Sequence, residues 1–328
     1  MNFPQLFRKE ILITPSSVKL NHSNNFLLLG SCFTQNISRF LSLNGFDNFY
    51  PFGTLYNPYT IVKNLNMILN NEPYQLNDLI GNEDIFYSWN HSGSYCNSDK
   101  NTLLKEINLE LSGLNKFLSN KSTIIITLGT SYVYEHNTYG IVGNCHKIPA
   151  PEFSKRLLQY NEMLIPWKEL ITKMKSIRFI FTVSPVRHWT DGAVENTRSK
   201  SLLHLLVSEL ESTFDNVTYF PSYELMMDEL RDYRFYKKDM LHPSDEAVEF
   251  IWDKFKGFCF SKESIQTINS ISEIRKSIAH VPFNPTSKKH AEFLKKLLIK
   301  IDLIQKDTPY YKWDKEIIDI KKKIDAVN

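Results

Sequence analysis

Three uninterrupted apolar runs along the chain predict the buried strands of a parallel sheet. They lie at residues 25–30, 122–130 and 177–185. Their apolar residues are continuous rather than alternating, which is typical of strands covered on both faces. Two weaker segments of the same kind lie at 46–53 and 217–224.

Helix-like segments fill the intervals between the predicted strands. They span residues 34–44, 58–70, 101–119, 161–175 and 196–213. In the last of them, apolar residues form the stripe of an amphipathic helix that packs on a sheet. Strands that alternate with helices predict an α/β domain in which a parallel sheet lies between helical layers.

The C-terminal part has a purely helical pattern. Isoleucine and leucine recur every three or four residues at 265–278 and again at 294–304, on either side of the sequence VPFNPTS. This pattern predicts a helical hairpin packed on the main domain, with a solvated, lysine-rich outer face. We therefore expect a catalytic domain at 1–260 and a helical extension at 261–328.

Composition excludes several classes of protein. The 328 residues are 42% hydrophobic and 23% charged with a net charge of +3, so nothing favours nucleic acid as a partner. No apolar run approaches the roughly 18–20 residues of a membrane span, and the N-terminus lacks the pattern of a signal peptide. The four cysteines are scattered. These features predict a cytoplasmic protein with reduced thiols and no cofactor.

Residues suited to chemistry follow the predicted strands. The carboxyl ends of parallel strands meet at one edge of a sheet, where ligands bind. The residues that follow the five strands in turn include Ser31, Gly53, Gly129, Arg187 and Asp239. Because all five positions are expected at the same edge of the sheet, together they indicate a functional site more strongly than any single motif does.

Ser31 ends the first strand and precedes a helix, which allows two interpretations. Its hydroxyl could lie near helix amides that favour developing negative charge, as a nucleophile requires. Alternatively, it is only the N-cap of that helix. The neighbouring Cys32 is expected to point inward as a small core residue.

Asp239 and His242 have the spacing D-x-x-H before a predicted helix start. Three residues of separation let the carboxylate contact one imidazole nitrogen while the other faces outward, as a general base requires. The alternative is a surface capping arrangement. Considered together with Ser31 at another strand end, the catalytic interpretation is preferred.

Other polar residues are candidates for substrate binding. Arg187 could hold an anionic or polyhydroxyl substrate, or pair with a local acid, and His188 could contact substrate. Trp89 and His91 could line a pocket, or belong to a loop that packs on the domain.

Cys145 and His146 are adjacent in sequence, which is poor geometry for a thiolate–imidazole pair, so a buried or binding role is expected for both. A metal site formed by these two residues and His136 lacks the usual ligand spacing. No metal is therefore expected.

Seven segments together carry a family resemblance: GSCFTQNI, PFGTLYNP, TLGTSYVY, NCHKIPAPEF, TVSPVRHW, FPSYELMMDELRDYRFY and DMLHPS. They resemble the GSCFA family, a branch related to the SGNH, or GDSL-like, hydrolases. The resemblance runs from about residue 26 to about residue 256, and HVPFNP near residue 280 resembles the family's C-terminal region.

This resemblance implies a three-layer α/β/α, flavodoxin-like fold with a helical extension. It implies Ser31 as nucleophile, His242 as base and Asp239 as the carboxylate that orients the base. The oxyanion donors would be the amides of Ser31 and Gly53.

The third oxyanion donor is where the sequence departs from those hydrolases. They usually carry asparagine two residues after the glycine that follows the third strand, whereas here Ser131 stands two residues after Gly129. One such donor is typically worth about 3 to 4 kcal/mol of transition-state stabilisation. Asn144 could supply the missing amide if its loop folds over Ser31. Gly129 and Ser131, with His146, are then expected to contact substrate.

The expected function is that of a serine hydrolase of acyl-ester type, an esterase or deacetylase acting on a small-molecule or carbohydrate ester. Two alternatives remain open. One is an O-acyltransferase with the same residues, and the other is a non-catalytic SGNH-like module that binds a ligand.

Overall fold

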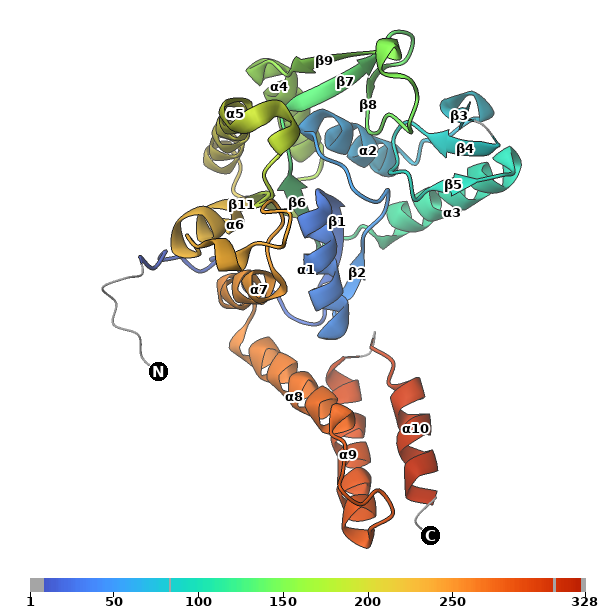
Figure 1. Cartoon of the computed structure of the whole chain (residues 1–328), viewed down its shortest axis with the longest axis vertical. Helices are drawn as coiled ribbons and strands as arrows, with labels where there is room; N and C mark the ends of the chain where they lie inside the picture. Colours follow the sequence, from blue (N-terminus) through green and yellow to red (C-terminus); the bar gives the residue numbers. More distant parts are fainter. Residues whose placement is uncertain (1–8, 83, 309–310, 326–328) are drawn as a thin grey trace.

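A five-stranded parallel sheet forms the centre of the computed structural model, which describes residues 9–82, 84–308 and 311–325 (Figure 1). Its strands are β1 (Asn25–Gly30), β2 (Asp47–Phe49), β6 (Ser122–Leu128), β10 (Arg178–Val183) and β11 (Val217–Tyr219). They lie in the order β11-β10-β6-β1-β2, and every pair is parallel. This is the order of flavodoxin-like, doubly wound folds, in which the crevice for ligands opens where the chain direction switches beside the first strand.

Both faces of the sheet are buried. Leu27 and Leu29 of β1 belong to one hydrophobic core, and Phe26 and Leu28 belong to the core on the other face. The first core is closed by α2 (Pro58–Asn70), α3 (Lys100–Phe117), α4 (Tyr160–Lys173) and α5 (Gly192–Thr213). The second is closed by α1 (Cys32–Leu43) and α7 (Asp245–Cys259). The predicted three-layer α/β/α fold is confirmed, and burial on both faces explains the continuous apolar runs.

The two weaker strands are shorter than predicted. Only three residues of 46–53 and three of 217–224 pair with the sheet. Pro221 follows the second of these, and the chain then turns into α6 (Ser222–Glu224) and a π-helical turn (Leu225–Glu229). Proline has no amide hydrogen to donate to a strand partner, which is consistent with the early end of the strand.

Two small antiparallel sheets were not predicted. They consist of β3 (Leu79–Asn82), β4 (Ile85–Ser88) and β5 (Cys96–Asn97), and of β8 (Gly140–Val142), β7 (Tyr132–His136) and β9 (Phe153–Leu157). These strands are short and half-exposed, so they lack the apolar runs by which the central strands were found. Short helical turns occur at Leu76–Asp78, Ala150–Glu152, Trp189–Asp191 and Tyr233–Phe235.

The C-terminal part is a bundle of three helices, α8 (Lys262–Ala279), α9 (Lys288–Asp307) and α10 (Asp314–Asp325), with a core of its own. The predicted hairpin corresponds to α8 and α9, whereas α10 was not predicted. The bundle projects from the α/β part (Figure 1). Ile268 joins the core beneath α1 and α7, and Thr308 touches Gly45 just before β2 begins. The bundle therefore lies at the amino-terminal end of the sheet.

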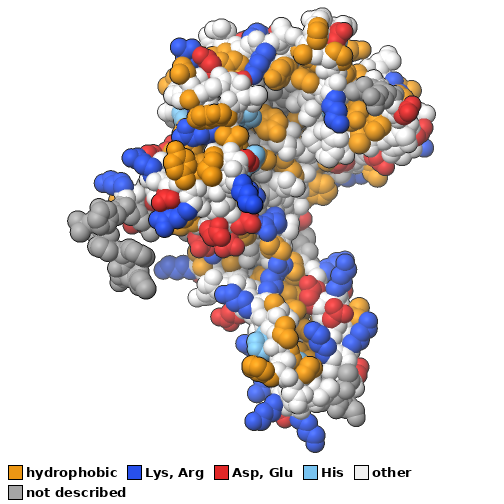
Figure 2. All heavy atoms as spheres, viewed as in Figure 1, with side chains coloured by type: hydrophobic (Ala, Val, Ile, Leu, Met, Phe, Trp, Pro, Cys, Tyr) orange, Lys and Arg blue, Asp and Glu red, His pale blue; other side chains and the backbone are white. Residues whose placement is uncertain are grey.

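The surface of the bundle carries lysine and arginine side chains mixed with hydrophobic ones (Figure 2). No helix among the described residues is long and apolar enough to cross a membrane. The outer ends of the two predicted domains, residues 1–8 and 326–328, lie outside the described residues.

Candidate active site

Ser31 lies between β1 and α1, as the sequence predicts, but its hydroxyl does not cap the helix. The residue occupies the N-cap position, and its side chain makes no capping hydrogen bond. Instead its Oγ donates to the Oγ of Ser184, which follows β10, at 2.9 Å. The residue is 1% exposed. Ser31 therefore holds the predicted N-cap position, but its hydroxyl faces the neighbouring strand end and does not cap the helix.

The loop that carries Gly53 lies against the end of β1. The Leu55 amide donates to the carbonyl of Gly30 at 2.8 Å. Gly53 has φ +65°, and a Cβ built on it would lie 2.0 Å from Ser92 Oγ, so a side chain at this position is excluded by both the backbone and its neighbour. The Gly53 amide donates to no described residue, which leaves it available to an oxyanion.

The amide of Ser31 itself is not available in this way, because it donates to the carbonyl of Thr127 at 3.0 Å. Among the described residues, the amides of Cys32 and Phe33 at the start of α1 donate to no backbone carbonyl, but they lie near the Cys32 sulfur. A helix N-terminus presents such unpaired donors and a positive dipole end. Gly53 and these two amides are thus backbone donors near the end of β1 that bind no described carbonyl.

Gly129 and Ser131 brace the end of β6. The amide of Gly129 donates to the carbonyl of Tyr56 at 2.8 Å. Ser131 has no exposed surface, and its hydroxyl donates to the carbonyl of Ser199 on α5 at 2.6 Å. This position differs from the predicted contact with substrate, since both residues are engaged in joining β6 to its neighbours.

Asn144 and His146 belong to a tight turn that packs against the β3-β4-β5 insert. The amide of His146 donates to Asn144 Oδ1 at 3.0 Å, and His146 Nε2 lies 2.8 Å from the carbonyl of Ser88. His146 is buried and stacks on Tyr87. No hydrogen bond joins Asn144 to Ser31 in the part of the chain described, so the structure does not show the predicted third donor in place.

His91 is buried beneath the Gly53 loop rather than in a pocket. Its ring contacts Phe52, Tyr74 and Tyr95, and its Nδ1 lies 2.9 Å from Ser88 Oγ. Burial lowers the pKa of His91 to about 3, so the ring is neutral at ordinary pH. With 1% of its surface exposed, His91 supports the loop and does not face substrate. Of the two interpretations of this segment, the loop packed on the domain is the one observed.

Asp239 and His242 form the pair that their spacing predicts. Asp239 Oδ2 lies 2.7 Å from His242 Nδ1, while Oδ1 accepts from the amides of Leu241 and His242. These bonds, with the two amides contributing most, lower the pKa of Asp239 to about 2. The side chains are 45% and 44% exposed. The carboxylate thus fixes the imidazole through Nδ1 and leaves Nε2 to face outward.

The Asp239–His242 loop lies on the Ser31 side of the sheet. It leads into α7, which packs with α1 in one core. Tyr236, at the start of the loop, donates to Met227 Sδ, and the same sulfur accepts from Arg187 Nη2 at 3.1 Å. Arg187 therefore contacts a sulfur, and in the described part of the chain no hydrogen bond or ion pair joins it to an acid, the second of its two predicted partners. No hydrogen bond joins Ser31 to His242 among the described residues.

His188, on the loop after β10, lies against Tyr56 and close enough to His242 to feel its charge. Its ring meets Tyr56 edge-on at 5.2 Å. Burial lowers the pKa of His188 to about 4, and the charges of Lys200, Lys155 and His242 act in the same direction. A neutral His188 near His242 is consistent with its predicted place at the mouth of the site.

Cys32 is more exposed than Ser31, contrary to the expectation that it points inward. Burial nevertheless raises the pKa of its thiol, so the sulfur is protonated at neutral pH and is a weak nucleophile there. Cys145 is also partly exposed with a pKa raised by burial. No group of three metal-ligating side chains occurs in the described ranges.

Two residues of this region were missed by the sequence analysis, Ser184 and Lys200. Lys200 is 2% exposed, and its Nζ donates to the carbonyls of Gly129 at 2.7 Å and Ser184 at 2.9 Å. A signal for it exists in the sequence. Lys200 lies three positions before Leu203 and thus on the apolar face of α5, where a lysine is unexpected.

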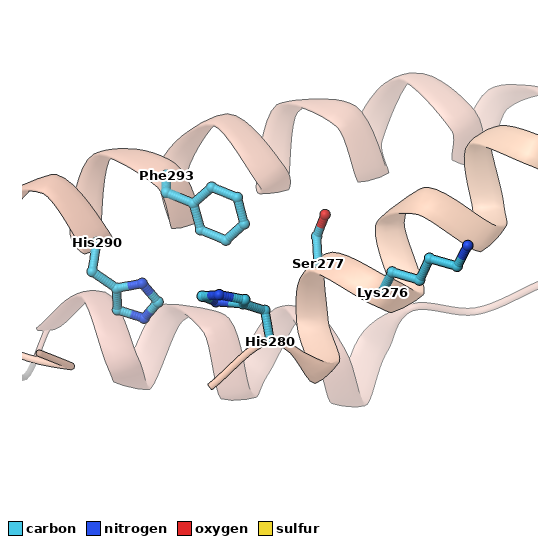
Figure 3. A pocket seen from close by; sticks show the side chains of 5 residues that line it. All are labelled: Lys276, Ser277, His280, His290 and Phe293. Carbon is cyan, nitrogen blue, oxygen red and sulfur yellow. The ribbon is translucent and has the colours of Figure 1, made fainter. Parts of the chain in front are cut away.

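A hollow of about 330 Å³ lies between α8 and α9, far from the strand ends (Figure 3). It is lined by Lys276, Ser277, His280, His290 and Phe293. The hollow has no carboxylate among these residues to orient either histidine. It therefore lacks the carboxylate–imidazole pair that the Asp239–His242 loop provides.

The chain matches a known family over most of its length. The GSCFA family matches residues 25–255, and the C-terminal domain of GSCFA domain proteins matches residues 271–326. No curated protein and no solved structure matches the chain. The first match covers every strand of the central sheet and both Ser31 and the Asp239–His242 pair. The chain belongs to the GSCFA family.

Proposed function

We propose that the protein is a serine hydrolase of acyl esters and a relative of the SGNH hydrolases. Ser31 is the nucleophile, His242 the general base, and Asp239 the carboxylate that orients the base. The observation that carries the proposal is the Asp239–His242 pair, because the carboxylate is bonded both to the imidazole and to two amides of its own turn. A surface ion pair needs no such double anchoring, whereas a base must be held in one orientation.

The proposed reaction has two steps. His242 Nε2 removes the proton of Ser31 Oγ as this oxygen forms a bond to the ester carbonyl carbon. The tetrahedral oxyanion then collapses, the bond to the alcohol oxygen breaks, and the alcohol leaves with the proton from His242. Water repeats the sequence on the acyl-serine and releases the acid.

The oxyanion would be held by backbone amides. Gly53 supplies one donor, and the amides of Cys32 and Phe33 at the start of α1 are the other candidates. Each such donor typically contributes about 3 to 4 kcal/mol to the stability of the transition state. The proposal therefore does not depend on Ser131 or on the amide of Ser31, both of which are engaged elsewhere.

In the structure, the Ser31 side chain has the orientation expected before a substrate binds. Its hydroxyl donates to Ser184 and must turn toward His242 before attack. Hydrogen bonds between nucleophile and base are often absent until substrate binds. A complex with a phosphonate bound to Ser31 would test this rotation directly.

The proposed substrate is an ester of a small acyl group such as acetyl, carried by an alcohol or a carbohydrate. The near-complete burial of Ser31 favours one alternative, transfer of the acyl group to an alcohol in a site from which water is excluded. The engaged amide of Ser31 favours the other, a module that binds a ligand without turnover.

The first experiment measures hydrolysis of p-nitrophenyl acetate by the parent and by Ser31→Ala, with Cys32→Ala as the matched control. Ser31→Ala should lose about 10³-fold or more in kcat, whereas Cys32→Ala should retain most of the activity. Equal rates for the parent and Ser31→Ala would refute the serine hydrolase. Partitioning of the acyl group between water and added sugars then separates hydrolase from transferase.

A further inference from the structure

Lys200 is a buried cation with an unusual set of partners. Its ammonium donates to two carbonyls, those of Gly129 and Ser184, and lies 5.7 Å from the centre of the Tyr223 ring. No described carboxylate pairs with it. An ammonium buried without a counter-ion is costly, so such lysines are rare in ordinary cores.

The two carbonyls belong to the ends of adjacent strands. Gly129 follows β6 and Ser184 follows β10, and Lys200 reaches both from α5. The ammonium thus joins three elements at the carboxyl edge of the sheet. Ser184 lies between Lys200 and the nucleophile position, because its carbonyl accepts from Lys200 and its hydroxyl accepts from Ser31.

We propose that Ser184 and Lys200 are positioning residues for Ser31: Lys200 fixes the two strand ends, and Ser184 holds the Ser31 hydroxyl through their hydrogen bond. This inference rests on the proposed function of Ser31. When Ser31 turns toward His242, the hydroxyl of Ser184 can rotate and donate to Ser31 Oγ. The same contact then supports the oxygen as its proton leaves.

The charge of Lys200 also reaches the nucleophile position. The ammonium lowers the pKa of the thiol of Cys32, the residue next to Ser31, against the larger effect of burial. A positive charge here favours negative charge on Ser31 Oγ in the same way. Burial, with a smaller effect from Arg187, lowers the pKa of Lys200 to about 7, so this support is lost in mildly alkaline solution.

Other ionisable groups around Lys200 keep their charge between pH 7 and 9. The loop after β10 carries the guanidinium of Arg187 and also His188, whose lowered pKa keeps its ring neutral. The pKa of His204, on α5 itself, is lowered, so this ring is neutral too. Cys32 of α1 and Tyr223 of α6 have raised pKa values and stay protonated. Among these groups, a change in labelling rate between pH 7 and 9 is therefore assigned to the titration of Lys200.

The test measures the second-order rate constant for labelling of the full-length protein by an alkyl fluorophosphonate. In this reaction Ser31 Oγ bonds to phosphorus, fluoride leaves, and His242 takes the proton. Ser184→Ala keeps the carbonyl that Lys200 binds and removes only the hydroxyl, and it should slow labelling about 5- to 10-fold. Lys200→Met should slow it about 10²-fold at pH 6.5, because the strand ends are no longer fixed.

The matched control is Ser222→Ala. Ser222 is equally buried and donates to the carbonyl of Val183, beside Ser184, but it does not touch Ser31. It should be labelled at the parent rate. The ratio of the parent rate to the Lys200→Met rate should fall as the pH rises from 6.5 to 9, whereas a purely structural role would leave this ratio constant.

The outcomes are distinct. Parent rates or faster rates for Ser184→Ala overturn the inference while leaving Ser31 as nucleophile, provided that Ser31→Ala is not labelled. Absence of labelling in the parent overturns both the inference and the proposed function. If Lys200→Met does not fold, Ser184→Ala decides the question alone.

Discussion

At the scale of single residues, Gly53 shows how backbone conformation limits the chemistry of the site. Its φ of +65° and the 2.0 Å distance from a built Cβ to Ser92 Oγ leave no room for a side chain. Gly140, in the turn between β7 and β8, has a similar φ of +69° but no atom within 4 Å of its built Cβ. Substitution of Gly140 therefore tests backbone strain alone, whereas substitution of Gly53 tests backbone strain together with a steric clash.

We predict that Gly140→Ala loses about 1–2 kcal/mol of unfolding free energy through the left-handed conformation, and that Gly53→Ala loses more, because the clash with Ser92 adds to the same strain. Only Gly53→Ala should also lose labelling of Ser31, because its loop must move away from Ser92. Urea unfolding and the fluorophosphonate rate measure the two effects. Unimpaired labelling of Gly53→Ala would show that this loop holds no part of the oxyanion site.

His91 gives a residue-scale prediction about pH. Its pKa of about 3 lies below the value of about 6.5 expected in the unfolded chain, so between these two values the unfolded state binds the extra proton. Its contribution to stability is complete above about pH 6.5 and is lost as the pH falls toward 3.

We expect the unfolding free energy of the parent to fall between pH 6.5 and 5 by more than that of His91→Phe. The difference in slope should be at most about 1.4 kcal/mol per pH unit. Phenylalanine is a suitable replacement, since the ring lies among Phe52, Tyr74 and Tyr95. The other histidines are common to both proteins, so identical slopes would show that His91 is not the group that titrates.

At the scale of elements, two residues of α9 that are only two positions apart lie on its buried and its exposed face. Ile301 is 0% exposed in the core of the C-terminal bundle, and Leu303 is 58% exposed. The same chemical deletion can therefore be made on each face of one helix.

Ile301→Ala should lower the unfolding free energy of the bundle by about 2–4 kcal/mol, and Leu303→Ala by no more than about 0.5 kcal/mol. Thermal unfolding followed by circular dichroism measures the difference. Labelling of Ser31 should be unchanged in both variants, because the bundle lies at the other end of the sheet. A slower rate in Ile301→Ala alone would instead reveal coupling between the bundle and the site.

The elements also show which patterns predict structure well. β1 was predicted with its observed bounds, and α2 likewise, because each is a strongly apolar segment with clear ends. Asn57 accepts from the Thr60 amide and Pro58 occupies the first turn, as is typical of a helix start. The strands β3 and β7 were missed because their faces are only partly buried, so their sequences contain no continuous apolar run.

At the scale of the whole molecule, the order of the strands places the site. β1 and β6 lie side by side although about 90 residues separate their ends, and β10 pairs with β6. This arrangement brings Ser31 together with Ser184 and Lys200, which lie more than 150 residues further along the chain. The Asp239–His242 loop reaches the same end of the sheet because α7 packs beside α1.

The sequence by itself determined the individual strands, the burial of both their faces and the local Asp239–His242 contact, because each depends on residues close together in the chain. Only the tertiary structure decided how the side chains at the strand ends are used. It turned Ser31 toward Ser184, engaged Ser131 with Ser199, and buried His91 beneath the Gly53 loop. These outcomes depend on which strands become neighbours and on which helix covers them. The spacing of residues along the chain predicts neither the neighbouring strands nor the covering helix.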